Sequence, residues 1–309
     1  FDYRPMLAPL APLVRSADLA ICHLETPLSG PGVPISGPPR FAAPHQLATA
    51  IRSTGYDGCS TASNHSLDQG KAGIRTTLDA LDRVGLGHTG TARTRAESRR
   101  IARYRIDGAE IAHLAFSYGF NGLRPRHAWM ANRIRAATIV RRATAARETG
   151  ASLVIVSLHW GTEFRHVPDP SQQRLARRIM DSGVVDLIIG HHAHVVQPVR
   201  RVHDRWVAYG VGNSLTGMTA ADSIIDAQDG MVLIATFAQN TDGWSLARMR
   251  FAPTWVQPQR FLVHLVGPAL DRRRLPSPIL AALRRSWRRT VGAVDASSLG
   301  VIPFRGRHV

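Results

Sequence analysis

The sequence predicts an α/β fold, in which helices first alternate with strands and a series of strands then follows. Up to about residue 190, apolar runs of strand length alternate with segments of helical periodicity. From there to about residue 268, apolar runs recur with turn residues between them. Four of the earlier runs also end in polar residues that can bind metal ions. In open α/β sheets, active residues gather at such carboxyl ends of strands.

The individual elements can be placed in chain order. A helix covers Ile74 to Val84 and stops at the sequence GLG, and the segments on either side of Gly108 form a hairpin. Helices over about 133–149 and 170–182 each precede a strand, LVIVSLH and VVDLIIG respectively. The later strands are VVQPVRRV, WVAYGVGN, MVLIATF, WSLARMRF and RFLVHLV. This order predicts two packed mixed sheets with helices outside.

Length and composition limit the class of protein. A chain of 309 residues with 44% hydrophobic residues can bury a large core, so it is not a disordered chain. We assign residues 1–268 to one domain and residues 269–309 to a basic helical extension. No stretch resembles a membrane span or a secretory signal, and because the chain begins at Phe1 we expect further residues upstream.

The formal net charge of +17 allows two interpretations. Lys71 is the only lysine, and Ala, Gly and Arg are abundant, which indicates a coding bias. The charge therefore reflects either a solvated basic surface or a preference for anionic ligands. No basic run is interleaved with aromatic residues, so nucleic acid is not an expected partner.

Cys22 and Cys59 each lie in an expected buried strand. A thiol in such a position most often packs as a small apolar group, and a disulfide between neighbouring strands is the alternative. We therefore expect two buried free thiols. The cysteines leave the compartment of the protein open.

The segment VVDLIIGHHAHVVQP, residues 184–198, is the most informative part of the chain. Its apolar run breaks at Gly190, and His192 and His194 alternate as the end of a strand would place them, so both imidazoles can reach one ion. Alone, this pattern indicates either a metal site or a polar strand end. Three further apolar runs end in comparable residues: His23 and Glu25; Asn64, His65 and Asp68; His159 and Glu163. Four converging strand ends predict one site.

Several of these candidates also have a purely structural explanation. Asn64 offers an amide oxygen to a metal ion, but an asparagine before a helix is also a common turn or cap residue. Asp68 either orients His65 or caps the following helix. Glu163 either orients an imidazole or is a loop residue, whereas a strand-end histidine such as His159 followed by glycine favours function. We treat the remaining isolated histidines as background: His113, His166, His203 and His264.

Five motifs in this order, LETPL, SNHSLDQG, HWGTEF, GHHAHVVQP and YGVGNSL, resemble those of the CapA or PgsA proteins of poly-γ-glutamate capsule synthesis. These proteins belong to the calcineurin-like metallophosphoesterase superfamily. The resemblance runs from FDYRPMLAPLAPLVRSADLA through FAPTW at 251–255 and covers most of the chain up to about residue 268. It implies a four-layer α/β/β/α sandwich of two mixed sheets with two divalent metal ions, Mn, Fe or Zn, at strand ends.

The resemblance also implies roles for individual residues. The metal ligands carried over by position are Glu25, Asn64, His159, His192 and His194. His65, oriented by Asp68, would be the acid or would hold the substrate anion. Glu163 and His191 are not carried over from the family; they are our own candidates for residues that support the ligands.

Two departures from the family pattern affect this interpretation. The first strand of the superfamily ends in Gly-Asp, and we expect that strand and its metal-binding aspartate to precede Phe1. The family usually has asparagine where this chain has His23. His23 either adds an imidazole to the site or indicates a change to acid/base chemistry, so we include it among the catalytic candidates.

We therefore expect a metal-dependent hydrolase that cleaves a phosphoester or a poly-γ-glutamate or peptide-like anionic substrate. The sequence does not determine the compartment: a capsule protein would be anchored outside the cytoplasm, in a capsule-synthesis membrane complex. The alternative is a metal-independent peptide epimerase of a ribosomal-peptide pathway of the lasso type, since CapA-like proteins of actinobacteria also resemble such enzymes. An epimerase would be cytoplasmic and would use acid/base catalysis at Cα. A non-catalytic capsule-synthesis subunit is the third hypothesis.

Overall fold

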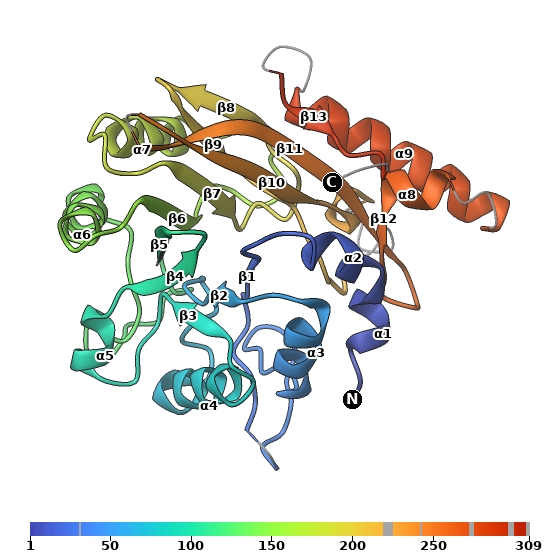
Figure 1. The fold of residues 1–309 in the computed structure, drawn as a ribbon. Helices are drawn as coiled ribbons and strands as arrows, with labels where there is room; N and C mark the ends of the chain where they lie inside the picture. The colour runs from blue at the N-terminus through green and yellow to red at the C-terminus, as the bar shows by residue number, and fades with distance from the viewer. Residues whose placement is uncertain (31, 219–224, 242, 272–274, 296–299, 307–309) are drawn as a thin grey trace. The chain divides into compact units, whose positions relative to one another are not determined.

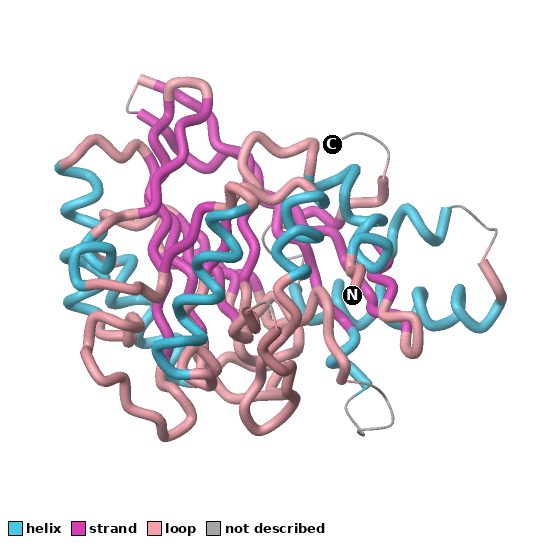
Figure 2. Tube along the Cα trace, turned by 90° about the horizontal axis from the view of Figure 1, so that it is seen from below, coloured by secondary structure: helices cyan, strands magenta, loops and turns pink. Residues whose placement is uncertain are grey.

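The structure, a computed structural model, describes residues 1–30, 32–218, 225–241, 243–271, 275–295 and 300–306. Helices and strands occur throughout the described chain (Figures 1 and 2). The chain divides into two compact units. Unit 1 comprises residues 1–4, 14–160 and 182–185, and unit 2 comprises residues 5–13, 161–181 and 186–309. Short helices open the chain: α1 (Arg4–Leu7), η1 (Ala8–Leu10) and α2 (Ala11–Val14).

The first sheet of unit 1 is parallel, with strands β1 (Ile21–His23), β2 (Gly58–Ser60) and β3 (Gly87–Thr89) in that order. Helices α3 (Gln46–Thr54) and α4 (Gly70–Arg83) connect these strands. Helix α4 buries Ile74, Leu78 and Leu81, which recur at helical spacing and so form one apolar face. Because the three strands are parallel, they end on the same side of the sheet, at His23, Ser60 and Thr89.

The second set of strands in unit 1 is mixed. Strands β4 (Ala102–Ile106) and β5 (Ala109–Ser117) form an antiparallel hairpin, and β5 pairs in parallel with β6 (Leu153–His159). Asp107 and Gly108 both have positive φ, as a two-residue hairpin turn requires. Two helices belong to this region: α5 (Arg95–Arg99) and α6 (Ala136–Glu148). All residues of β6 are buried, and the strand carries His159 at its carboxyl end.

Unit 2 contains two groups of strands. Strand β7 (Leu187–His191) pairs in parallel with β9 (Arg205–Ala208), which pairs antiparallel with β8 (Val199–Val202). Helix α7 (Pro170–Met180) begins with a capping box formed by Asp169 and Gln172. After η3 (Ile225–Gln228), the second group contains β10 (Asp229–Asn240), β11 (Gly243–Gln257), β12 (Leu262–Leu265) and β13 (Ile302–Pro303).

Two C-terminal helices, α8 (Val266–Asp271) and α9 (Ser277–Val294), pack against β11. Trp255 of β11 forms a buried apolar cluster with Val266, Ala269 and Leu283. The division into residues 1–268 and 269–309 stays a prediction, and residues 272–274, 296–299 and 307–309 of the expected extension lie outside the described residues. Within the described residues, no helix has the length and apolar character that crossing a membrane requires.

Cys22 and Cys59 form a disulfide, so the expectation of free thiols is wrong. The two residues are direct partners in the parallel register of β1 and β2, and their Cα atoms are 4.4 Å apart. This separation suits a disulfide. The two cysteines are 37 residues apart in sequence. Only the pairing of the two strands brings them face to face.

Candidate functional site

Three strand ends of unit 1 bring potential metal ligands together around His159. This residue ends β6, and its side chain is fully buried. Its Nε2 lies 2.8 Å from Oδ1 of Asn64 and 3.9 Å from Oε1 of Glu25, which follows β1. A carboxylate oxygen, an amide oxygen and an imidazole nitrogen thus lie close enough together to bind one metal ion.

His23 lies on the other side of the His159 ring. Its Nε2 is 3.0 Å from Nδ1 of His159, and its Nδ1 is 2.7 Å from Oγ of Ser60. When Nδ1 of His159 donates to His23, the lone pair on Nε2 of His159 faces Asn64 and Glu25. That tautomer prepares His159 to bind a cation. The position of His23 therefore suits a residue that orients His159.

Asn121 controls the orientation of the Asn64 amide. Asn64 Nδ2 donates to Oδ1 of Asn121 at 3.2 Å, which leaves Oδ1 of Asn64 toward His159. Asn121 has a φ of 48°, and Gly122 also has positive φ. Our sequence reasoning did not include Asn121 among the candidates. The Asn-Gly pair was the available signal, because this dipeptide is typical of turns with left-handed backbone.

His65 and Asp68 form a hydrogen-bonded pair beside Asn64 in the sequence. Nδ1 of His65 donates to Oδ2 of Asp68 at 2.7 Å, and the same carboxylate oxygen accepts from the backbone N–H of Phe41 at 2.8 Å. Asp68 is buried, while His65 retains some exposure. The carboxylate therefore holds the proton on Nδ1. Nε2 of His65 is then the nitrogen that can exchange a proton with another group.

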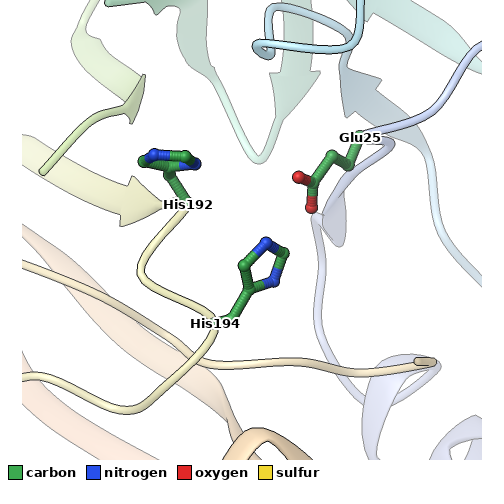
Figure 3. Close-up of side chains that lie close together, drawn as sticks. All are labelled: Glu25, His192 and His194. Atoms are coloured by element: carbon green, nitrogen blue, oxygen red, sulfur yellow. The ribbon is translucent and has the colours of Figure 1, made fainter. Parts of the chain in front are cut away.

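In unit 2, His192 and His194 lie in the loop after β7, as Figure 3 shows. The expectation that they continue a strand is wrong, because β7 ends at His191 and both residues have left-handed backbone, with φ of 87° and 56°. Such backbone is unfavourable for residues other than glycine and concentrates at functional sites. A ring nitrogen of each histidine lies within 4.8 Å of the other. We expected the alternation of side chains along a strand to bring the two rings close together. In the structure, the left-handed loop backbone does this instead.

Asn213 fixes the ring of His194. Its Oδ1 lies 3.0 Å from Nδ1 of His194, and its Nδ2 donates to the carbonyl oxygen of Ala227 at 2.8 Å. The Phe164 ring stacks on His194 with centroids 5.9 Å apart. Nδ1 of His194 thus faces a protein acceptor, so Nε2 is the nitrogen that can bind an ion. Asn213 lies in the motif YGVGNSL, but our sequence reasoning gave it no role.

The remaining candidates of unit 2 lie around the same loop. Oε1 of Glu163 is 3.9 Å from Nδ1 of His192, and His191 is the half-buried last residue of β7. Their expected support of the ligands stays a prediction. His166, which we treated as background, has a partner at each ring nitrogen. Its Nδ1 donates to the carbonyl oxygen of Val196 at 3.0 Å, and its Nε2 lies 3.0 Å from Oδ2 of Asp226.

Helix α9 also reaches this region of unit 2. Arg289 donates from Nε and Nη2 to the carboxylate of Asp229, at 2.6 and 2.9 Å. The backbone carbonyl of Asp229 accepts from the N–H of Asn213. Burial raises the pKa of the Asp229 carboxyl, and the hydrogen bonds from Arg289 oppose this shift. The C-terminal helix is thereby linked to the residue that orients His194.

The donor atoms of both units suit divalent metal ions. Imidazole nitrogen together with carboxylate and amide oxygen is a ligand combination found for Mn, Fe and Zn. In unit 1 the donors are Glu25, Asn64 and His159, and in unit 2 they are His192 and His194. The described residues thus present candidate metal-binding groups.

Comparison with known families decides the affiliation of the chain. Residues 1–218 match the family of bacterial capsule synthesis proteins termed PGA_cap. The chain belongs to this family. A capsule-synthesis family member, the capsule biosynthesis protein CapA of Bacillus anthracis, is 26% identical over 178 residues, which are 56% of this chain and 43% of the relative. A probable polyglutamine synthesis accessory protein of Mycobacterium tuberculosis is 26% identical over 228 residues, 69% of this chain and 60% of that protein. The chain therefore spans about half the length of these relatives.

A solved structure supports the fold class of this chain. The NAD nucleotidase of Haemophilus influenzae superposes with a TM-score of 0.51 at 11% identity, covering 99% of this chain and 58% of the nucleotidase. At this identity the likeness concerns the fold alone. The expected CapA/PgsA-like affiliation is confirmed, and so is the expected α/β class with mixed sheets.

Proposed function

We propose that this capsule-synthesis family member is a metal-dependent hydrolase that cleaves a phosphoester or amide bond in an anionic polymer. The observation that carries the proposal is the ligand group around His159. Its Nε2 approaches Asn64 Oδ1 and Glu25 Oε1, which arrive from two other strand ends. One nitrogen and two oxygen atoms this close together are explained if they bind the same cation.

The proposed ligands are Glu25, Asn64, His159, His192 and His194, of which Figure 3 draws three. When bound, divalent ions acidify water and offset the negative charge that builds up on a phosphoryl or acyl oxygen. The protein orients the ligands through their neighbours. His23 holds the ring of His159, and Asn213 holds the ring of His194.

His65 is the proposed proton donor to the leaving group. Asp68 accepts from Nδ1 of His65 at 2.7 Å, so the ring keeps one orientation and presents Nε2. A protonated Nε2 can donate to the departing oxygen or nitrogen, or hold the substrate anion. Because Asp68 is buried and also binds the N–H of Phe41, it serves this histidine and does not face the substrate.

The contacts of His23 favour hydrolysis over epimerisation. An epimerase of this kind needs acid and base groups that face the substrate Cα. Both ring nitrogens of His23 already lie within hydrogen-bond distance of protein partners, Ser60 and His159. We therefore place His23 among the residues that orient ligands.

We further propose that the protein works outside the cytoplasm with a capsule-synthesis complex on an anionic polymer. The disulfide between Cys22 and Cys59 supports this location, since disulfides persist in oxidising compartments. The names of the relatives in Bacillus anthracis and Mycobacterium tuberculosis support the link to polymer synthesis. The net charge of +17 supports an anionic substrate.

The test combines metal analysis with hydrolysis assays. The purified chain is loaded with Mn²⁺, Fe²⁺ or Zn²⁺ and incubated with bis(p-nitrophenyl) phosphate and with poly-γ-glutamate, whose chain length is followed by size-exclusion chromatography. We expect bound metal, cleavage of one substrate, and loss of both in His159→Ala and His192→Ala. His203→Ala is the matched control, because His203 is exposed and pairs with Asp181.

Three outcomes would contradict the proposal. Full activity of a metal-free protein with chelator present would remove the metal from the reaction. Solvent deuterium at the Cα of a peptide substrate would identify an epimerase. Bound metal with neither substrate cleaved would support the non-catalytic capsule-synthesis subunit.

A further inference from the structure

Unit 1 contains a cavity of about 340 Å³ that none of the candidate metal ligands lines. Its walls come from β3, from the segment that includes α5, from the beginning of β4, and from Asn132 and Arg142. Cavities above about 300 Å³ are large enough for small organic ligands. Because it shares no lining residue with the candidate metal centre, we consider this cavity as a separate site.

Four arginines line the cavity, and two of them are neutralised by carboxylates. Arg93 lies 2.6 Å from Asp79, 2.7 Å from Asp82 and 2.5 Å from Glu97. Arg103 is paired with Glu110. The acidic side chains of the cavity wall, Asp82 and Glu97, are thus already occupied by Arg93.

The other two arginines, Arg100 and Arg142, have no carboxylate within ion-pair distance among the described residues. Arg142 is half-buried on α6, and its guanidinium donates to the backbone oxygens of Ser98 and Arg100, each at 2.8 Å. Burial lowers the pKa of Arg142, and the neighbouring Arg141 lowers it further. The two carbonyl groups orient this cation without balancing its charge. A bound anion would supply the missing charge.

Polar groups complete the wall of the cavity. Thr89, Thr91 and Asn132 lie along it, and so does Tyr104. The Tyr104 hydroxyl is buried without a hydrogen-bond partner among the described residues. Burial, together with Asp57, raises the pKa of Tyr104 to about 12, so at neutral pH the hydroxyl keeps its proton. The Tyr104 hydroxyl points toward Gly58 and Gly87, so the groups that suit a ligand with hydroxyl or carbonyl oxygens besides its charge are Thr89, Thr91 and Asn132.

We propose that this cavity binds a small polar organic anion whose carboxylate or phosphate contacts Arg142 and Arg100. The volume exceeds what a single inorganic ion needs, and the hydrogen-bonding wall selects a polar molecule over an apolar one. The site is independent of the metal centre proposed above, and either one can fail without the other.

Calorimetric titration tests the site, with citrate as the carboxylate probe, glycerol 3-phosphate as the phosphate probe and glycerol as the uncharged control. The metal-free chain is used in buffer with 150 mM chloride. We expect at least one of the two anions to bind, with no heat from glycerol. The stronger of the two identifies the oxyanion that the site prefers. Absence of binding by both anions at millimolar concentration would overturn the proposal.

Matched arginine variants distinguish the cavity from general attraction to a basic chain. Arg142→Met should weaken binding about tenfold or more, because a charge-assisted hydrogen bond is lost. Arg141→Met makes the same charge change at an exposed neighbour outside the cavity wall and should leave affinity near the wild-type value. Equal weakening in both variants would mean that the anion binds without a defined site.

Arg100→Gln is the second variant, because Arg142 also binds two carbonyl groups and its replacement can disturb folding. The Arg100 side chain is exposed, and its replacement removes charge from the cavity without removing those bonds. We expect weaker anion binding with an unchanged melting temperature. Unchanged affinity in Arg100→Gln, together with unchanged affinity in a folded Arg142→Met, would refute the site.

Discussion

The two groups of candidate ligands are positioned by different means. In unit 1, Glu25 and Asn64 follow the neighbouring parallel strands β1 and β2, and His159 is the last residue of β6. In unit 2, His192 and His194 lie on a loop with left-handed backbone. The difference teaches that strand geometry can place donors without strain, whereas two histidines separated by one residue converge here only through an unfavourable backbone.

Each group also depends on a different kind of support. A disulfide between β1 and β2 fixes the strands that precede Glu25 and Asn64. The loop of unit 2 is held by hydrogen bonds of Asn213 and by the stacking of Phe164 on His194. Reduction of the disulfide should therefore disturb the ligand positions of the first group. Loss of the Asn213 side chain should disturb those of the second group.

The largest effect is expected from His159→Ala, which removes the central nitrogen of the unit 1 group. We expect metal affinity to fall by about a hundredfold or more, because a ligand is lost and not only its support. Calorimetric titration with Zn²⁺ or Mn²⁺ measures this change. His203→Ala should bind metal as the wild type does. Equal affinities of the His159→Ala protein and the wild type would exclude His159 as a ligand.

The disulfide gives the next largest effect. Replacing Cys22 and Cys59 by serine should lower the free energy of unfolding by about 2–4 kcal/mol, as expected when a link between residues 37 apart is lost. Urea unfolding measures the difference. A reducing agent should destabilise the wild type by a similar amount and leave the double variant unchanged. If reductant affects both proteins equally, the link between β1 and β2 is not formed in solution.

His113 is a buried histidine of unit 1 that is not a ligand candidate. It should make the free energy of unfolding depend on pH. Burial lowers its pKa from 6.5 to about 4. Between these values the unfolded chain binds more protons at this residue than the folded chain, so stability falls as pH drops through this range, by up to about 3 kcal/mol. His113→Gln keeps a polar partner for Ser157 and should show a smaller loss between pH 7 and pH 4. An identical pH profile in both proteins would show that His113 is not buried in its neutral form.

Asn213→Ala should have the smallest effect of the four and should act on the unit 2 group. Without Asn213, Nδ1 of His194 loses its partner, and metal affinity should fall about 10- to 100-fold. Asn240→Ala, on the exposed end of β10, is the control. The difference between the two variants should be larger for metal affinity than for melting temperature. A large drop in melting temperature with unchanged metal affinity would assign Asn213 a structural role only.

The predicted elements were close to those observed where the sequence pattern was regular. The hairpin around Gly108, the helix from Ile74, and the strand ending at His159 were all expected, because apolar periodicity and turn residues are local properties. The prediction for His192 and His194 was wrong in its local structure. Alternation along a chain does not reveal where a strand stops and the backbone becomes left-handed.

The sequence by itself determined the order of elements, the family affiliation and the residue types available for metal binding, because these depend on motifs and on local periodicity. Tertiary structure alone decided which side chains meet. The register of β1 against β2 paired Cys22 with Cys59, and the convergence of strand ends placed His23 behind His159. The cavity beside Arg142 likewise arises from segments that are distant in the chain. Contacts of this kind follow from how strands and helices pack, and no neighbouring residues in the sequence encode them.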